Sequence, residues 1–187
     1  MSERELTGPA ERRSSPDRHH EHDQYTLTCV VEIPRGSRNK YEFDPALDAI
    51  RLDRFISAAV VYPTDYGFVP ETIAPDGDPL DVLVCVSEPT FPGCFVITRP
   101  VALLCFADEK GPDDHLVCVP CADPSWTGVR DLDDIPEQLK AEIGHFFSIY
   151  KDLDPTRNST VSGWRDRGAA WDAVGSARAT WEAHQRD

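Results

Sequence analysis

The sequence predicts an α+β fold in which a small β-barrel is flanked by α-helices. Short apolar runs separated by tight turns recur between residues 25 and 119, a pattern typical of a small barrel. Two later segments, 136–150 and 166–181, carry apolar residues at helical spacing. The chain has 187 residues, a length that fits one domain with a sizeable core.

The first strand is predicted at residues 25–33, because apolar side chains occupy every second position there. Further strands are predicted near residues 40–43, 50–55, 82–86, 94–106 and 115–119. The run Val-Leu-Val-Cys-Val at 82–86 is short, β-branched and uninterrupted, which indicates a buried strand. In the segment 62–68, Tyr62 and Tyr66 are expected to bracket a turn.

Both helices are predicted from apolar spacing and from the residues that begin them. Asp134 is expected to cap the helix at 136–150, with Glu137 completing a capping box and Pro136 in the first turn. Its buried stripe is predicted to contain Leu139, Ile143, Phe146, Phe147 and Tyr150. The helix at 166–181 is expected to turn Trp171 and Val174 inward.

Residues 1–24 differ in composition from the rest of the chain. After Met1 they contain one large aliphatic residue, Leu6, among many Arg, Glu, Ser, Pro and His residues. They contain no apolar segment of a signal peptide, and they cannot bury enough surface to offset chain entropy. We therefore expect a disordered tail at 1–24, with its His-His-Glu-His run solvated, and one domain at 25–187.

Charge and cysteine content narrow the class of protein. The net charge of −14 argues against nucleic acids and anionic membranes as partners, because phosphate-rich surfaces require clustered Lys and Arg. No apolar run is long enough to span a bilayer. Only Cys118 and Cys121 among the six cysteines have C-x-x-C spacing, and no second pair accompanies them. Reduced, structural thiols are the expectation.

The hexapeptide Asp-Gly-Asp-Pro-Leu-Asp at 76–81 is the strongest candidate for a functional site. It places three carboxylates in a turn just before the predicted strand 82–86. Crowded carboxylates repel one another, and a hard cation such as Mg²⁺ between them relieves that repulsion. A solvated acidic turn is the alternative. A calcium EF-hand loop is excluded, because its sixth and twelfth positions would be Asp81 and Ser87 instead of Gly and Glu.

A second acidic cluster spans residues 108–114, between two apolar runs, with Gly111 and Pro112 at its centre. This is the pattern of a hairpin loop, which alone would be a solvated turn more often than a site. Beside the hexapeptide it supplies carboxylates from a second segment, which a site with several metal ions requires.

Candidate cations and phenols come from other segments. Strand alternation places Lys40 and Glu42 on one face, as either surface decoration or part of a site. Arg54 falls on the apolar face of Ile50 and Leu52, where it needs a partner such as a phosphate. The tyrosines at 62 and 66 have a core role as their alternative.

Taken together, these motifs resemble the soluble family I inorganic pyrophosphatases of the prokaryotic type. The matching segments run in one order from about residue 25 to residue 175. They are Glu32-Ile33-Pro34, Lys40-Tyr41-Glu42, Leu52-Asp53-Arg54, the segment 62–67, the hexapeptide 76–81, Arg99-Pro100-Val101, Asp108-Glu109, Asp113, Val119-Pro120, His145-Phe146-Phe147 and Tyr150-Lys151-Asp152-Leu153.

The resemblance implies a five-stranded OB-like barrel and a cytoplasmic enzyme, a homohexamer, that hydrolyses pyrophosphate with several Mg²⁺ ions. The implied metal ligands are Glu32, Glu42, Asp76, Asp81, Asp108 and Asp113. Asp78 is the implied general base, with Asp113 as the second choice. The implied substrate-binding residues are Lys40, Arg54, Tyr66, Tyr150 and Lys151, and Tyr62 would lie behind them.

Three positions depart from the family pattern, in which lysine is usual: His115, Arg157 and Thr160. His115 either reaches the phosphate site, as a lysine would, or points to solvent at the edge of a loop. The altered late loop and the tail leave a second function open, a catalytically slow paralogue that binds phosphate compounds or a partner protein. A Mg²⁺ phosphohydrolase of nucleotides is a third alternative, although no base-stacking platform is visible in the sequence.

Overall fold

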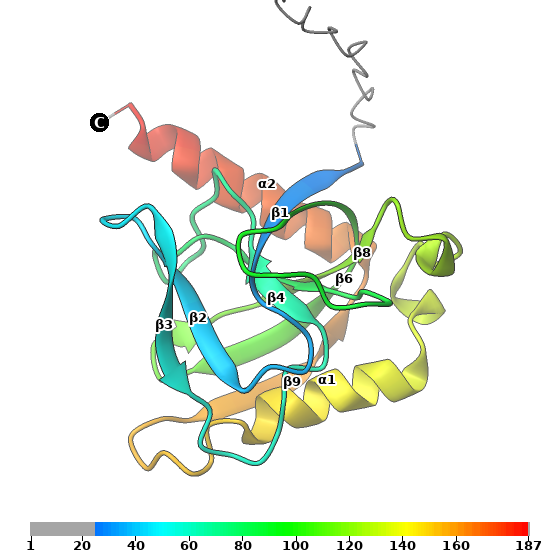
Figure 1. Cartoon of the computed structure of the whole chain (residues 1–187). Helices are drawn as coiled ribbons and strands as arrows, with labels where there is room; N and C mark the ends of the chain where they lie inside the picture. Colours follow the sequence, from blue (N-terminus) through cyan, green and yellow to red (C-terminus); the bar gives the residue numbers. More distant parts are fainter. Residues whose placement is uncertain (1–24, 187) are drawn as a thin grey trace, which may run out of the picture.

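The computed structural model describes residues 25–186, and the predicted tail at 1–24 lies outside the described residues (Figure 1). Five strands close into a ring by pairing each with the next: β1 (Leu27–Ile33), β4 (Asp65–Phe68), β5 (Asp81–Val84), β8 (His115–Pro120) and β6 (Phe95–Asp108), which returns to β1. All these pairings are antiparallel except β5 with β8. The predicted five-stranded barrel is confirmed.

Other elements surround this ring. A separate hairpin consists of β2 (Asn39–Asp44) and β3 (Ala49–Phe55), while β7 (Gly111–Pro112) and β9 (Ser159–Arg165) pair with β6. Two α-helices, α1 (Glu137–Ile149) and α2 (Arg167–His184), lie below and above the strands in the view of Figure 1. Two 3₁₀ helices, η1 (Pro124–Trp126) and η2 (Leu132–Asp134), precede α1. No helix in residues 25–186 is long and apolar enough to cross a membrane.

The apolar run of β5 is buried on both faces, because each face supplies one of two core clusters. Val82 and Val84 pack in the cluster that includes Val174 of α2. Leu83 packs in the other cluster, with Phe147 of α1. A strand covered on both sides has no solvent-facing position for a polar residue, which explains the uninterrupted hydrophobic sequence.

The predicted start of α1 is wrong in its detail. Pro136 occupies the N-cap position and no side chain caps the helix. Asp134 instead accepts the backbone N–H groups of Arg130 and Asp131, in a capping box with Asp131 at the start of η2. The short 3₁₀ turn uses this carboxylate before α1 begins. The start of α2 is as predicted, and Asp166 caps it by accepting the N–H of Ala169 at 2.9 Å.

Three strands occur where the sequence predicts none: β4, β9 and the two-residue β7 in the predicted loop at 108–114. β4 lies in the predicted turn at 62–68, and Gly67 allows its close approach to β1. A Cβ atom at Gly67 would lie 1.9 Å from the carbonyl oxygen of Val30, so only glycine fits. β9 reads Ser-Thr-Val-Ser-Gly-Trp-Arg, too polar for a recognisable strand pattern, and it forms by pairing with β6.

Candidate functional site

Parallel pairing of β5 with β8 brings the two acidic clusters together. Asp81 is the first residue of β5 and His115 the first of β8, with Val82 opposite Leu116. The Nε2 atom of His115 lies 3.5 Å from a carboxylate oxygen of Asp81 and 3.5 Å from one of Asp113. One ligand atom from each of these three residues lies within 4.8 Å of the others, so the group could hold a metal ion.

Burial changes the pKa values of the side chains at this group. It raises the pKa of Asp81, an effect that nearby His115 opposes and Asp113 reinforces. The hydroxyl group of Tyr66 donates a short hydrogen bond to Asp81. Burial also raises the pKa of Tyr66, so this hydroxyl stays protonated and acts as a donor. Of the two alternatives for His115, the one in which it points to solvent is wrong, because its side chain is 1% exposed.

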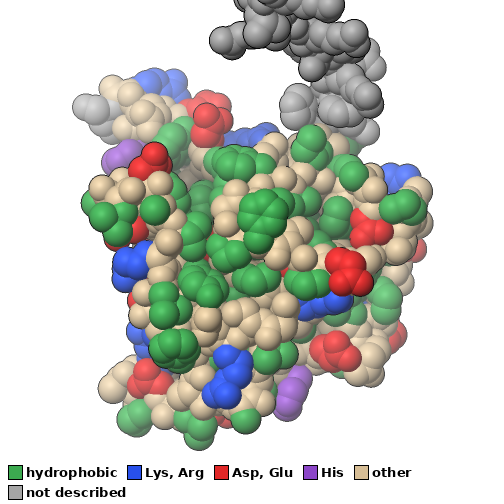
Figure 2. All heavy atoms as spheres, in the orientation of Figure 1, with side chains coloured by type: hydrophobic (Ala, Val, Ile, Leu, Met, Phe, Trp, Pro, Cys, Tyr) green, Lys and Arg blue, Asp and Glu red, His purple; other side chains and the backbone are tan. Residues whose placement is uncertain are grey.

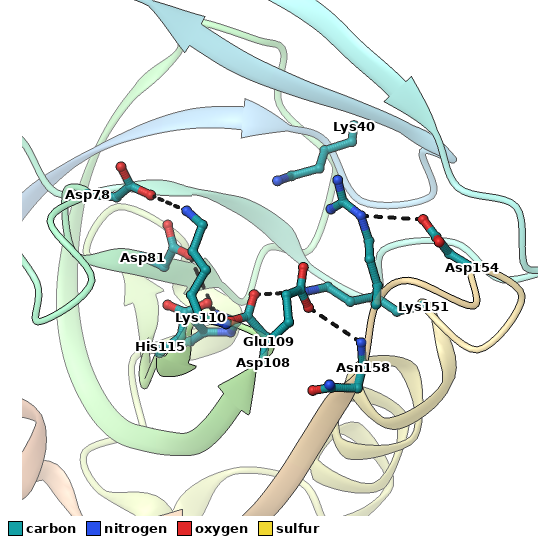
Figure 3. Close-up of polar contacts among 12 residues, drawn as sticks. Lys40, Asp78, Asp81, Asp108, Glu109, Lys110, His115, Lys151, Asp154 and Asn158 are labelled. Carbon is teal, nitrogen blue, oxygen red and sulfur yellow. Dashed lines mark hydrogen bonds and ion pairs between the residues drawn. The ribbon is translucent and has the colours of Figure 1, made fainter.

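The turn of the hexapeptide forms the rim of the site. Gly77 has a φ of +93°, and Asp78 donates its N–H to the Asp76 carboxylate at 3.1 Å. Burial raises the pKa of Asp76, and repulsion from Asp78 and Asp113 adds to this effect. Asp78 is 64% exposed and pairs with Lys110 at 3.1 Å, as Figure 3 shows. The turn therefore projects Asp78 into solvent, outside the group of Asp81, Asp113 and His115.

Asp108 joins the site through the buried ammonium group of Lys151. This ammonium lies 2.8 Å from Asp108 and 3.2 Å from Glu109, with all three side chains drawn in Figure 3. Burial alone would raise the pKa of Asp108, but the hydrogen bonds from Lys151 and from the N–H of Lys110, together with the charges of both lysines, outweigh it, and the net shift is downward. Asp108 is thus a carboxylate held in its charged form.

The hairpin of β2 and β3 contributes Lys40, Glu42 and Arg54. Lys40 and Glu42 share one face, as predicted, and form an ion pair at 2.8 Å. The prediction for Arg54 is wrong: Lys40 lies opposite Arg54, but Tyr41 lies opposite Leu52, so an irregularity of the pairing changes the register. Arg54 therefore shares the face of Lys40 instead of that of Leu52.

A cationic cavity of about 270 Å³ opens between this hairpin and the end of α1. Its lining includes Lys40, Arg54, Tyr150, Lys151, Asp154 and Arg157. Four cations face one carboxylate there, which suits an anion such as a phosphate group. Burial raises the pKa of Tyr150, so its phenol remains a hydrogen-bond donor. Thr160 lies in β9 opposite Ala107 and is not part of this lining.

Glu32 and Tyr62 lie buried behind the site. Glu32 of β1 accepts the N–H of Phe43 at 2.7 Å, and burial raises its pKa to about 7. Tyr62 is 2% exposed, with its ring against Tyr66 and Phe146. Both therefore support neighbouring groups from the interior.

Two charged contacts were missed in the sequence. Lys110 pairs with Asp78, and Glu109 shares Lys151 with Asp108. A single lysine within the acidic cluster 108–114 was the available signal for Lys110. No signal in the sequence indicates that residue 109 reaches a lysine 42 positions away.

The five-stranded ring carries a site with carboxylates on one side and cations on the other. This combination is typical of one class, the metal-dependent proteins that act on phosphate groups. A family model described as inorganic pyrophosphatase matches residues 29–182 of this chain. The chain belongs to the inorganic pyrophosphatase family, and the predicted resemblance is confirmed.

Individual relatives agree with this assignment. An inorganic pyrophosphatase of Methanosarcina mazei is 48% identical over 153 residues, covering 81% of this chain and 90% of that protein. One of Thermus thermophilus is 50% identical over 147 residues, covering 78% and 84%. The crystal structure of the Thermus thermophilus inorganic pyrophosphatase matches with a TM-score of 0.84 at 45% identity, over 87% of this chain and 94% of that one. Family membership implies a divalent cation, and the group of Asp81, Asp113 and His115 fits one.

Proposed function

We propose that this protein hydrolyses inorganic pyrophosphate to two orthophosphates, with Mg²⁺ as its cation. The observation that carries the proposal is that metal-binding carboxylates and the cations of the cavity belong to one site, and Figure 3 shows Asp81 and Asp108 in one view with Lys40 and Lys151. Lys151 belongs to both halves of the site, because it lines the cavity and its ammonium group lies 2.8 Å from Asp108. Family membership supplies the reaction type.

Carboxylates from three segments would hold the cations. Asp76, Asp81 and Asp113 would bind those nearest the attacking water, and Asp108 would share a further cation with Asp113. Glu32 and Glu42 would contribute directly or through water. The support for these roles is electrostatic. Burial, and then repulsion from neighbouring carboxylates, raises the pKa of Asp76 and Asp81, and a bound cation would reverse this effect. Bound cations would supply a water of lowered pKa and neutralise phosphate charge.

The other residues have roles that follow from their charges. Asp78 would act as the general base, because it lies in solvent beside the metal-binding carboxylates, and Asp113 is the second candidate. Lys40, Arg54 and Lys151 would hold the phosphate groups and disperse their charge. The phenols of Tyr66 and Tyr150 would donate hydrogen bonds, and buried Tyr62 would fix the position of Tyr66.

The assembly that we propose is a homohexamer. Figure 2 shows hydrophobic side chains gathered over the middle of one face, where a partner subunit could cover them. Among the exposed large hydrophobic residues are Phe91, Phe95 and Ile97, with Phe95 70% exposed. We also propose a cytoplasmic location, supported by the buried thiols of Cys29, Cys85 and Cys118, which suit a reducing compartment.

A phosphate-release assay tests the proposed reaction. Pyrophosphate, ATP and a blank would each be incubated with the protein, in Mg²⁺ and in excess EDTA. We expect release from pyrophosphate in Mg²⁺ alone. Asp81→Asn should reduce it strongly, while Asp133→Asn, an exposed acid of η2, should not. Full turnover in EDTA, or faster release from ATP, would contradict the proposal. Phosphate binding without turnover would instead support the slow paralogue.

A further inference from the structure

His115 has an orientation that its surroundings fix. Its ring packs against the aromatic rings of Phe106 and Phe147, each with centroids 4.8 Å away, and edge-on against Tyr66 at 5.7 Å. The side chain is 1% exposed, so it cannot turn to water. Packing thus directs Nε2 toward the carboxylates of Asp81 and Asp113, as Figure 3 shows for the labelled pair His115 and Asp81.

Both ring nitrogens of His115 lack a hydrogen-bond partner in the part of the chain that the structure describes. A buried polar group without a partner is costly, and such groups in folded proteins usually have a role. Nε2 lies 3.5 Å from each carboxylate oxygen, too far for a good hydrogen bond. Two ligands of one cation, bonded at about 2.0–2.1 Å, lie roughly 3.0–3.4 Å apart. The observed separations are close to those of metal ligands.

A nitrogen donor changes which cation such a group prefers. Mg²⁺ takes oxygen ligands and rarely needs imidazole, whereas Zn²⁺ and Co²⁺ bind imidazole well. A lysine at the same place would carry a positive charge and repel a cation. A histidine ligand instead gives a nitrogen lone pair to the cation, between the two carboxylates Asp81 and Asp113.

We propose that His115 joins Asp81 and Asp113 as a direct ligand, forming a mixed nitrogen and oxygen site that binds a transition-metal ion of the Zn²⁺ or Co²⁺ class more tightly than the two carboxylates alone would. The inference rests on the proposed function, because it adds a ligand to the cation site proposed there. It predicts that His115 is itself a metal ligand, and that a lysine at this position would weaken the binding of such an ion.

Cobalt titration of the metal-free, full-length protein tests this proposal. Co²⁺ gives a visible spectrum that reports its ligands, and competition with Mg²⁺ gives the relative affinity. Changing His115→Gln should weaken Co²⁺ binding by roughly tenfold or more and alter the spectrum, with a smaller effect on Mg²⁺. His115→Lys should do the same. The matched control is His145→Gln, which removes an exposed histidine of α1 and should change neither.

The histidines of the tail require a second control. His19→Gln, His20→Gln and His22→Gln, made together, should leave the Co²⁺ spectrum unchanged. X-ray absorption of this triple variant loaded with Zn²⁺ should show an imidazole shell, a readout that does not depend on the folding of any His115 variant. Equal Co²⁺ affinity and spectra in wild type and His115→Gln, or no imidazole shell, would overturn the proposal.

The two proposals can fail separately. Hydrolysis of pyrophosphate in Mg²⁺ with no effect of His115→Gln on Co²⁺ would reject only the nitrogen ligand. Co²⁺ binding through His115 without hydrolysis of pyrophosphate in any cation would reject only the proposed reaction.

Discussion

Glu32 shows how burial changes the chemistry of one carboxyl group. Its pKa rises from an ordinary 4.5 to about 7, chiefly through burial, although the N–H of Phe43 stabilises the charged form. Between these two values the folded state keeps a proton that the unfolded state has released. In the metal-free protein, the raised pKa of Glu32 therefore leaves the free energy of unfolding unchanged well below pH 4.5. It lowers that free energy increasingly as the pH rises toward 7.

Glu32→Gln should therefore stabilise the metal-free protein at alkaline pH. Gln keeps the oxygen that accepts the N–H of Phe43, but it removes the buried charge. Urea unfolding in EDTA at pH 8 should show a gain of up to about 3 kcal/mol, and at pH 4 almost none. The same gain at both pH values would contradict this reading. Saturating Mg²⁺ should reduce the gain if Glu32 contributes to a cation site.

Asp78 and Asp81 should respond differently to the same substitution. Asp78→Asn should lower kcat by about 10²–10⁴-fold while cation affinity survives, because Asp78 lies in solvent and outside the buried group. Asp81→Asn should weaken cation binding, measured by calorimetry. Lys110→Gln controls for the ion pair with Asp78, and its effect on stability should stay below about 1 kcal/mol. Recovery of full rate by Asp78→Asn at high Mg²⁺ would reject the role of a base.

The pairing of β4 with β1 requires glycine at position 67. Gly67→Ala should destabilise the protein by more than about 3 kcal/mol, because its Cβ would overlap the backbone of Val30 and separate β4 from β1. Gly144→Ala in α1 is the control: nothing lies within 4 Å of its Cβ, and alanine should stabilise the helix by about 0.5–1 kcal/mol. Thermal unfolding measures both. Similar melting temperatures for the two variants would contradict the argument.

Elements were predictable where their own sequence determined them. The strands with alternating or continuous apolar residues and both helices were predicted, because burial of those residues leaves a periodic pattern. β4 and β9 were not, since each forms through pairing with distant strands and carries Gly, Asp or Ser. The irregularity opposite Lys40 is likewise a property of the pair β2 and β3. Local reasoning therefore placed Arg54 on the wrong face.

On the scale of the whole molecule, the hexamer is testable by mass. Six chains of 20.9 kDa would give about 125 kDa by light scattering at micromolar concentration, as expected of a closed symmetric assembly. Phe95→Asp should shift the mass downward if this exposed side chain lies in an interface, and the exposed control Asp133→Asn should not. A wild-type mass of one chain would reject the assembly.

The site was predictable as a set of residues and not as an arrangement. The order of the motifs along the chain identified the carboxylates and the basic residues of the site. Binding of cations and of phosphate groups requires these residue types, so they leave a recognisable pattern in the sequence. Their positions depend on the parallel pairing of β5 with β8, which no short segment encodes. The burial of His115 beside Asp81 and Asp113 follows from that pairing and from the aromatic rings of α1 and β6.

The long strand β6 has a consequence for how a newly made chain becomes a barrel. β6 pairs with β1, β7, β8 and β9, so residues 95–108 are partners to strands at both ends of the domain. While the ribosome is still adding the first ninety residues, β1 has one edge without its eventual neighbour, and a ring cannot close. Aggregation through such open edges is then a hazard of synthesis. Prematurely terminated chains that stop before residue 95 should be targets for chaperones and proteases.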